Sequence, residues 1–166
     1  MTDQYASEQF VTLGLDAELF AVPVELVREI LDMRQPFRIP EAPPHLAGLI
    51  DVRGQAVPLL DLRLKLGLPP RAATADTRIL VLEVPSQDRR LPLGLIADRV
   101  IEVTALDAGG TEPPPEIGTR WRCDYIQAIG RRAGQFVVIF DLARLLGSDA
   151  VALLDEAGAE EGRIAA

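Results

Sequence analysis

The chain contains an internal repeat, and a duplicated unit constrains the possible folds more than any other feature of its sequence. Residues 54–67 (GQAVPLLDLRLKLG) reappear as residues 134–147 (GQFVVIFDLARLLG), with seven of fourteen positions identical. Each copy reads as a turn glycine, a short apolar strand, an aspartate that caps a short helix, and a terminating glycine. The sequence therefore predicts an architecture that is built twice.

The similarity between the two copies extends upstream. Residues 27–30 (VREI) correspond to residues 100–103 (VIEV), and an apolar strand precedes each of them. Each half also opens with a strand and a polar turn. We therefore expect half-repeats at about 9–67 and 77–147, joined by a linker over residues 69–76 that is rich in proline and small side chains.

The predicted strands are short and lie between Gly and Pro turns, and the predicted helices are too short to cover a parallel sheet. This pattern is typical of small antiparallel barrels or sandwiches. A half of about 60 to 70 residues has a marginal core by itself, so we expect the two halves to pack together and to leave a groove between them. Residues 148–156 are predicted to form a further amphipathic helix, and residues 156–166 a flexible tail.

Composition argues against several classes of partner. The chain has 25 acidic and 17 basic side chains and a net charge of −8, so its surface repels phosphate backbones and anionic lipid. The nearest basic patches, Arg89-Arg90 and Arg131-Arg132, lie in short turns without interleaved aromatic side chains. Residues 1–9 lack the basic and apolar runs of a signal peptide, and no stretch resembles a membrane span. We expect no nucleic-acid partner and no membrane insertion.

No convincing catalytic group is visible in the sequence. The only histidine, His45, lies in a loop without a nucleophile motif and is interpreted as solvated. Cys123 is interpreted as an inert thiol, and a single cysteine indicates a reducing compartment such as the cytoplasm. Asp61 and Asp141 fit helix caps better than a carboxylate dyad, because each directly precedes an apolar helical turn. We expect a non-enzymatic protein without a metal or cofactor.

Residues 46–63 (LAGLIDVRGQAVPLLDLR) resemble the central signature of the CheW-type chemotaxis coupling proteins. The resemblance extends to residues 27–30, 94–100 and 151–155, so it spans a single domain over about residues 8–155. The chain departs from the family pattern at its fifty-first residue, where an aspartate replaces the usual asparagine. A carboxylate cannot donate the hydrogen bonds of an amide, so a local contact is expected to differ there.

The resemblance implies a mainly β fold of two intertwined, five-stranded, SH3-like β-barrels, with short helices, a C-terminal helix and a hydrophobic groove between the barrels. It also implies a cytoplasmic adaptor at membrane-associated receptor arrays. Such an adaptor joins the cytoplasmic helices of methyl-accepting chemoreceptors to the regulatory domain of a CheA-type histidine kinase, and no cofactor is implied. Two alternatives stay open: an adaptor of this type in a non-chemotactic kinase pathway, and a β-barrel domain that binds a small molecule or acts as an enzyme.

Four residues match functional positions of the family. By this resemblance Val27, Glu29 and Arg53 belong to a receptor-facing surface, and Gly48 is associated with kinase coupling. From the residues alone, Val27 fits a core position equally well, and Gly48 fits a backbone with positive φ. Arg53 needs a carboxylate partner if it is buried, and Glu29 is the candidate, although such a pair could be purely structural. Ala133 replaces Arg53 in the second half, so the predicted site is asymmetric.

Overall fold

A computed structural model of the chain describes residues 8–86, 88–114 and 125–145. The predicted C-terminal helix, the predicted tail and Cys123 lie outside these residues. In chain order the described elements are β1 (Phe10–Leu15), β2 (Glu18–Pro23), the 3₁₀ turn η1 (Val24–Leu26), β3 (Val27–Asp32), β4 (Leu46–Val52), β5 (Gln55–Asp61), α1 (Leu62–Lys65), β6 (Arg78–Ser86), β7 (Arg89–Ala97), β8 (Arg99–Thr104), β9 (Ile126–Arg132) and β10 (Gln135–Phe140).

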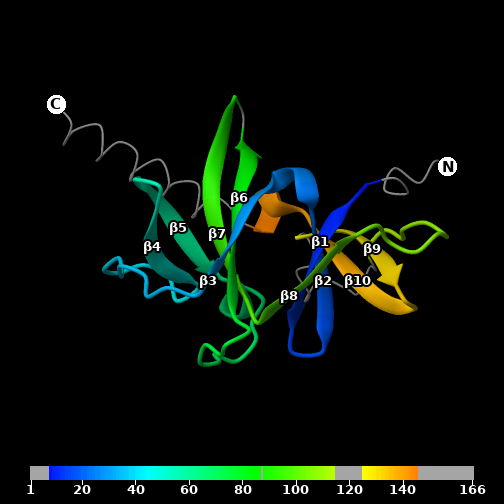
Figure 1. The fold of residues 1–166 in the computed structure, drawn as a ribbon, viewed down its shortest axis with the longest axis horizontal. Helices are drawn as coiled ribbons and strands as arrows, with labels where there is room; N and C mark the ends of the chain where they lie inside the picture. The colour runs from blue at the N-terminus through cyan, green and yellow to red at the C-terminus, as the bar shows by residue number, and fades with distance from the viewer. Residues whose placement is uncertain (1–7, 87, 115–124, 146–166) are drawn as a thin grey trace.

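The strands form two five-stranded sheets that lie next to each other (Figure 1). Sheet A has the order β8-β1-β2-β10-β9, and sheet B has the order β3-β6-β7-β5-β4. Each sheet therefore takes a hairpin from one half-repeat and three strands from the other. The halves are intertwined, as the family resemblance predicts.

Hydrogen bonds between strands of different halves hold this arrangement together. Strand β3 pairs with β6, and β1 pairs with β8, both antiparallel. Strand β5 pairs with β7, and β2 pairs with β10, both parallel. In both sheets, strands of one half thus pair with strands of the other half in the same way. The sequence repeat therefore corresponds to two equivalent sheets, and not to two halves with a sheet each.

The expectation of closed barrels is not met, because among the described residues the ladder of neither sheet closes. The edge strands are β3 and β4 in sheet B, and β8 and β9 in sheet A. In this part of the chain one isolated bridge reaches each outer edge, Phe37–Leu49 on β4 and Glu112–Ile129 on β9. A proline lies next to each bridging loop residue in the chain, and a fixed φ and a missing N–H disfavour a longer ladder.

The core explains why several strands are apolar along their whole length. In β6, Ile79 and Val81 face a cluster inside sheet B, whereas Leu80 and Leu82 face a larger cluster shared by the two sheets. Successive side chains of a strand point to opposite faces, so burial on both faces requires a continuous apolar run. The rings of Phe20 and Phe140, whose centroids are 5.1 Å apart, stack inside the shared cluster.

Candidate functional site

A tight turn between β4 and β5 presents Arg53 to solvent. Arg53 and Gly54 have φ angles of +55° and +82°, the signs of a type I′ turn. The Asp51 carboxylate accepts a hydrogen bond from the Gly54 N–H at 2.8 Å. An asparagine carbonyl would accept the same bond, so the aspartate leaves this contact of the turn intact. The Arg53 side chain is 78 % exposed.

The predicted pairing of Arg53 with Glu29 is confirmed. The Arg53 Nη2 and Glu29 Oε2 atoms lie 3.4 Å apart, and the ion pair joins the β4–β5 turn to the edge strand β3. A pair with one largely exposed partner contributes only about 0 to 1 kcal/mol to stability. The guanidinium thus remains accessible on the surface while Glu29 restricts its orientation.

The other two predicted site residues occupy different environments. Val27 is half-buried against the cluster shared by the sheets, and a register shift in β3 separates it from Glu29. Gly48 is buried with a φ of +140°, which confirms the expected positive φ. A Cβ atom on Gly48 would collide with the carbonyl oxygen of Phe37. The structure therefore joins Glu29 and Arg53, and places Gly48 against the loop that follows β3.

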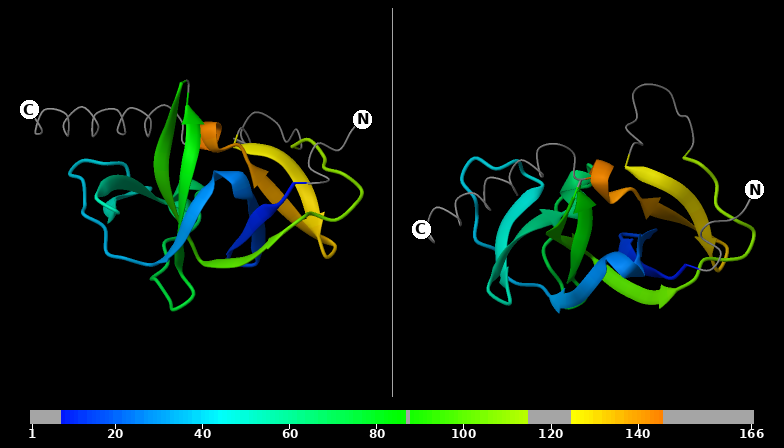
Figure 2. Two further views of the ribbon diagram at one scale, coloured as in Figure 1. Left: turned by 45° about the horizontal axis from the view of Figure 1, so that its top comes forward. Right: turned by 90° about the horizontal axis from the view of Figure 1, so that it is seen from above.

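Two equivalent edge strands carry an apolar strip that the sequence analysis missed. Ile30 on β3 is 41 % exposed, and Val103, its counterpart on β8, is 53 % exposed, with Ile101 beside it. Among the described residues β3 pairs only with β6, and β8 only with β1. Both strands lie at the middle of the molecule, where the two sheets meet (Figure 2). We call Ile30, Ile101 and Val103 the edge strip. On β3 the available signal was the alternation of Ile30 with the half-buried Glu29 and Leu31, whereas on β8 Ile101, Glu102 and Val103 are all exposed.

Sheet A contains a related ion pair. Glu102, the counterpart of Glu29, accepts a hydrogen bond from Arg132 Nε at 3.1 Å. Asp107 accepts hydrogen bonds from the backbone N–H groups of Gly134 and Ala133 at 3.0 and 3.1 Å. These N–H groups, with the nearby Arg132 charge, lower the pKa of the Asp107 carboxyl. In sheet A the cation is thus Arg132, which precedes the β9–β10 turn and lies between the Glu102 and Asp107 carboxylates.

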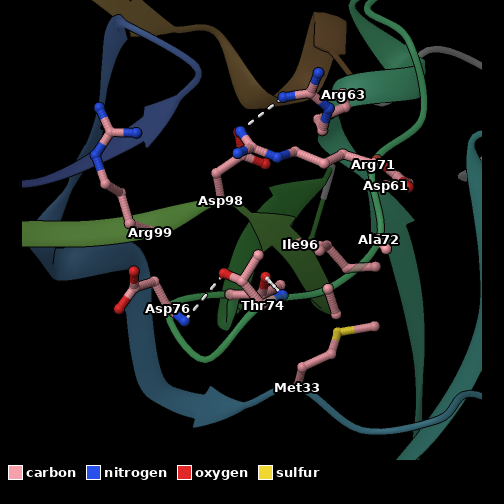
Figure 3. Close-up of a pocket in the computed structure, with 12 residues that line it drawn as sticks. Met33, Asp61, Arg63, Arg71, Ala72, Thr74, Asp76, Ile96, Asp98 and Arg99 are labelled. Carbon is pink, nitrogen blue, oxygen red and sulfur yellow. Dashed lines mark hydrogen bonds and ion pairs between the residues drawn. The ribbon is translucent and has the colours of Figure 1, made fainter.

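A second charged cluster joins the two sheets and was also missed (Figure 3). The buried Arg63 guanidinium lies 2.7 Å from both Asp16 Oδ1 and Asp98 Oδ2. Arg71 of the linker approaches Asp16 to 3.4 Å, and Arg99 donates to the Asp16 carbonyl at 2.6 Å. The hydrogen bond from Arg63 lowers the pKa of Asp16. We call these five residues the inter-sheet ion cluster.

The cluster borders a pocket of about 160 Å³ under the linker, which Asp61, Thr74 and Ile96 also line (Figure 3). Every buried side-chain nitrogen or oxygen among the described residues already has a hydrogen-bond partner. Arg63, Arg71, Asp98 and Arg99, which line the pocket, already pair with one another or with Asp16. This gives no support to the small-molecule alternative.

Residues considered for chemistry have structural roles. Asp61 accepts from the Leu64 N–H and Asp141 from the Arg144 N–H, so both predicted helix caps are confirmed. His45 is half-buried rather than solvated, and its carbonyl accepts from the Asp61 N–H. Within the described ranges no three His, Cys, Asp or Glu side chains gather as a metal site. Nor does that part of the chain contain a helix long and apolar enough to cross a bilayer.

Intertwined sheets with surface-exposed edge strands, and buried polar groups that pair with one another, are typical of a β-rich protein of the binding or scaffold class. The family model for the CheW-like domain matches residues 9–150. The chain therefore belongs to the CheW-like family, whose members are non-enzymatic scaffold and adaptor proteins, and the resemblance in the sequence is confirmed.

Individual relatives agree with this assignment. The chain is 26 % identical over 155 residues to the chemotaxis protein CheW of Klebsiella aerogenes, covering 93 % of this chain and 91 % of the relative. It is 30 % identical over 142 residues to CheW of Helicobacter pylori, covering 85 % and 82 %. The crystal structure of the scaffolding protein TtCheW from Thermoanaerobacter tengcongensis matches with a TM-score of 0.75 at 28 % identity, over 86 % of this chain and 90 % of that chain.

Proposed function

We propose that the chain couples the cytoplasmic helices of chemoreceptors to the regulatory domain of a CheA-type histidine kinase, in the cytoplasm at receptor arrays. It would act as a chemotaxis adaptor without chemistry of its own. Val27, Glu29 and Arg53 belong to the receptor-facing surface, and Gly48 belongs to the kinase-facing surface.

The observation that best supports the proposal is that Arg53 has a left-handed backbone conformation, which glycine adopts more easily than arginine. A left-handed conformation costs a non-glycine residue about 1 to 2 kcal/mol. Ala133 adopts the same conformation with φ +52° in the equivalent turn, so the turn forms without a guanidinium. The ion pair with Glu29 adds little stability because Arg53 is so exposed. A role in partner recognition accounts for Arg53 better than a role in the turn.

The surroundings of Arg53 fit an amphipathic helix as partner. Glu29 and Ile30 are consecutive residues of the exposed edge strand β3, so the ion pair and the edge strip share this strand, with their side chains on opposite faces of it. An amphipathic helix docks its apolar stripe on such a surface and is recognised at spacings of three and four residues. Arg53 would then orient the helix through one of its acidic side chains, and would add specificity more than affinity.

The test is a binding measurement with the receptor signalling fragment and the CheA-type kinase of the same cell. Arg53→Glu should weaken receptor binding at least about tenfold, because a like charge then faces Glu29 and the acidic helix. Ala133→Glu introduces the same charge in the equivalent turn and is the matched control. Unchanged receptor binding by Arg53→Glu would remove this residue from the site. Binding of the native chain to neither partner would overturn the proposed function.

A further inference from the structure

The loop between β3 and β4 carries the most exposed large apolar side chain among the described residues. Phe37 is 71 % exposed. Its backbone N–H and C=O both bond to Leu49 on the outer edge of β4, each at 2.8 Å. The main chain of Phe37 therefore protects the edge strand, while its ring points away from the fold into solvent.

The equivalent place in sheet A indicates that the ring is not needed for this bridge. There Glu112 makes the same two backbone bonds to Ile129, again at 2.8 Å, and Ile129 is the counterpart of Leu49 in the repeat. A glutamate thus serves as well as an aromatic residue. The Phe37 ring is therefore not needed for the bridge, and its exposure leaves it available to a partner.

The charges around Phe37 point to the chemistry of a partner. Arg34 and Arg38 flank Phe37, and neither has a carboxylate within ion-pair distance among the described residues. Arg34 instead donates to the Asp51 carbonyl at 2.7 Å. This local positive charge lies on a chain of net charge −8. Complementarity therefore favours a partner with carboxylates around an apolar pocket.

The loop leads from β3, which carries Ile30 of the edge strip, to β4, the opposite edge strand of sheet B. In Figures 1 and 2 it lies at the end of sheet B that points away from sheet A, whereas β3 and β8 lie at the middle. It is close to Gly48, because any Cβ there would collide with the Phe37 carbonyl and displace the loop. A side chain at Gly48 would thus act on a partner indirectly, through Phe37.

We propose that Phe37 and Arg38 form the kinase-docking point of this adaptor, with Phe37 inserted into an apolar pocket on the kinase regulatory domain and Arg38 facing acidic side chains at its rim. This assignment rests on the proposed function and specifies its kinase-facing surface. Buried aromatic and arginine side chains are the commonest anchors of protein interfaces.

The experiment measures the affinity of the full chain for the purified regulatory domain and for the receptor fragment. Phe37→Ala should weaken kinase binding about 30-fold, the usual loss at an interface anchor, and leave receptor binding unchanged. The matched control is Phe136→Ala, which removes a 58 % exposed ring from β10 of sheet A and should leave both affinities unchanged. The melting temperature of Phe37→Ala should not change, because the bridge to Leu49 uses backbone atoms.

Arg38→Ala tests the charge independently. It should weaken kinase binding severalfold and should make the remaining affinity less sensitive to salt. If the native chain binds the kinase and both variants bind equally well, the docking assignment is wrong while the proposed function stands. If the native chain binds neither partner, the proposed function fails and the assignment with it. If Phe37→Ala instead abolishes self-association and spares kinase binding, the occupant is a second copy and the proposal is overturned.

Discussion

The β4–β5 and β9–β10 turns share a backbone and differ in what holds them. The two central residues have φ angles of +55° and +82° in the first turn, and +52° and +79° in the second. The first is held by Asp51 from its own strand, and the second by Asp107 from the loop after β8. The repeat thus specifies the shape of the turn, whereas the side chains that hold it differ between the two sheets.

The largest difference between the halves is the buried arginine. Arg63 has Ala143 as its counterpart, so Arg63→Ala makes the first half resemble the second. We expect the unfolding free energy to fall by about 2 to 3 kcal/mol, because the mostly buried Asp98 and the half-exposed Asp16 lose their closest cation and keep only the more distant Arg71. Urea unfolding measures this loss. The control is Arg144→Ala, an exposed arginine of the second half, with a change below about 0.5 kcal/mol; equal losses would contradict a special role for the ion cluster.

The shared turn geometry predicts equal effects of one substitution in both turns. Gly54 and Gly134 have positive φ and open space around the position of a Cβ. Gly54→Ala and Gly134→Ala should each lower stability by about 1 to 2 kcal/mol through backbone strain alone. Thermal and urea unfolding of the pair measure this. A much larger loss in one variant would mean that the two turns are not equivalent.

The Asp107 carboxylate, which holds the second turn, predicts that the stability of the fold responds to acid. The pKa of Asp107 is lowered in the folded state, so this group stabilises the fold above its ordinary pKa of about 3.9 and ceases to do so as the pH falls through the lowered value. Asp107→Asn should be less stable than the native chain at neutral pH. The difference between the two should shrink as the pH falls below about 4. Unfolding between pH 2 and 7, followed by circular dichroism, measures it; a constant difference would refute the role of the charge.

The substitution with the smallest expected effect on stability is at Arg53, whose place in the second turn is taken by Ala133. Arg53→Ala gives the first turn the residue of the second and removes an exposed ion pair. The unfolding free energy should change by less than about 0.5 kcal/mol, whereas receptor binding should weaken. Isothermal titration with the receptor fragment separates the two effects. A large loss of stability without loss of binding would show that the ion pair with Glu29 is structural.

Local patterns of the sequence predicted local structure well. The Gly-Gln turns, the capping by Asp61 and Asp141, and the positive φ of Gly48 all follow from residue type and immediate neighbours. In each of these cases a short stretch of chain holds enough information to define the contact. The Arg53–Glu29 pair was also predicted, but from the cost of a buried arginine, whereas Arg53 is exposed.

Long-range features were not predictable in this way. Arg63 and Asp16 are 47 residues apart in sequence, and only the exchange of strands between the halves brings them together. The exposure of Ile30 was missed because it depends on the place of β3 at the edge of sheet B, which a short segment of sequence does not specify. The open barrels were missed because closure depends on how far the loops after β3 and β8 continue to pair with β4 and β9, which strand patterns do not specify.

The exchange of strands between the halves also determines when the chain can fold during synthesis. The hairpin β1–β2 is translated first, but its neighbours β8 and β10 belong to the second half of the chain. Until they leave the ribosome, the hairpin has two open edges and an exposed apolar face. Domains usually fold as units as they emerge, and here no unit smaller than the pair of sheets is complete. Exposed apolar surface and unpaired strand edges favour aggregation, so the nascent first half is the most vulnerable stage of this folding route.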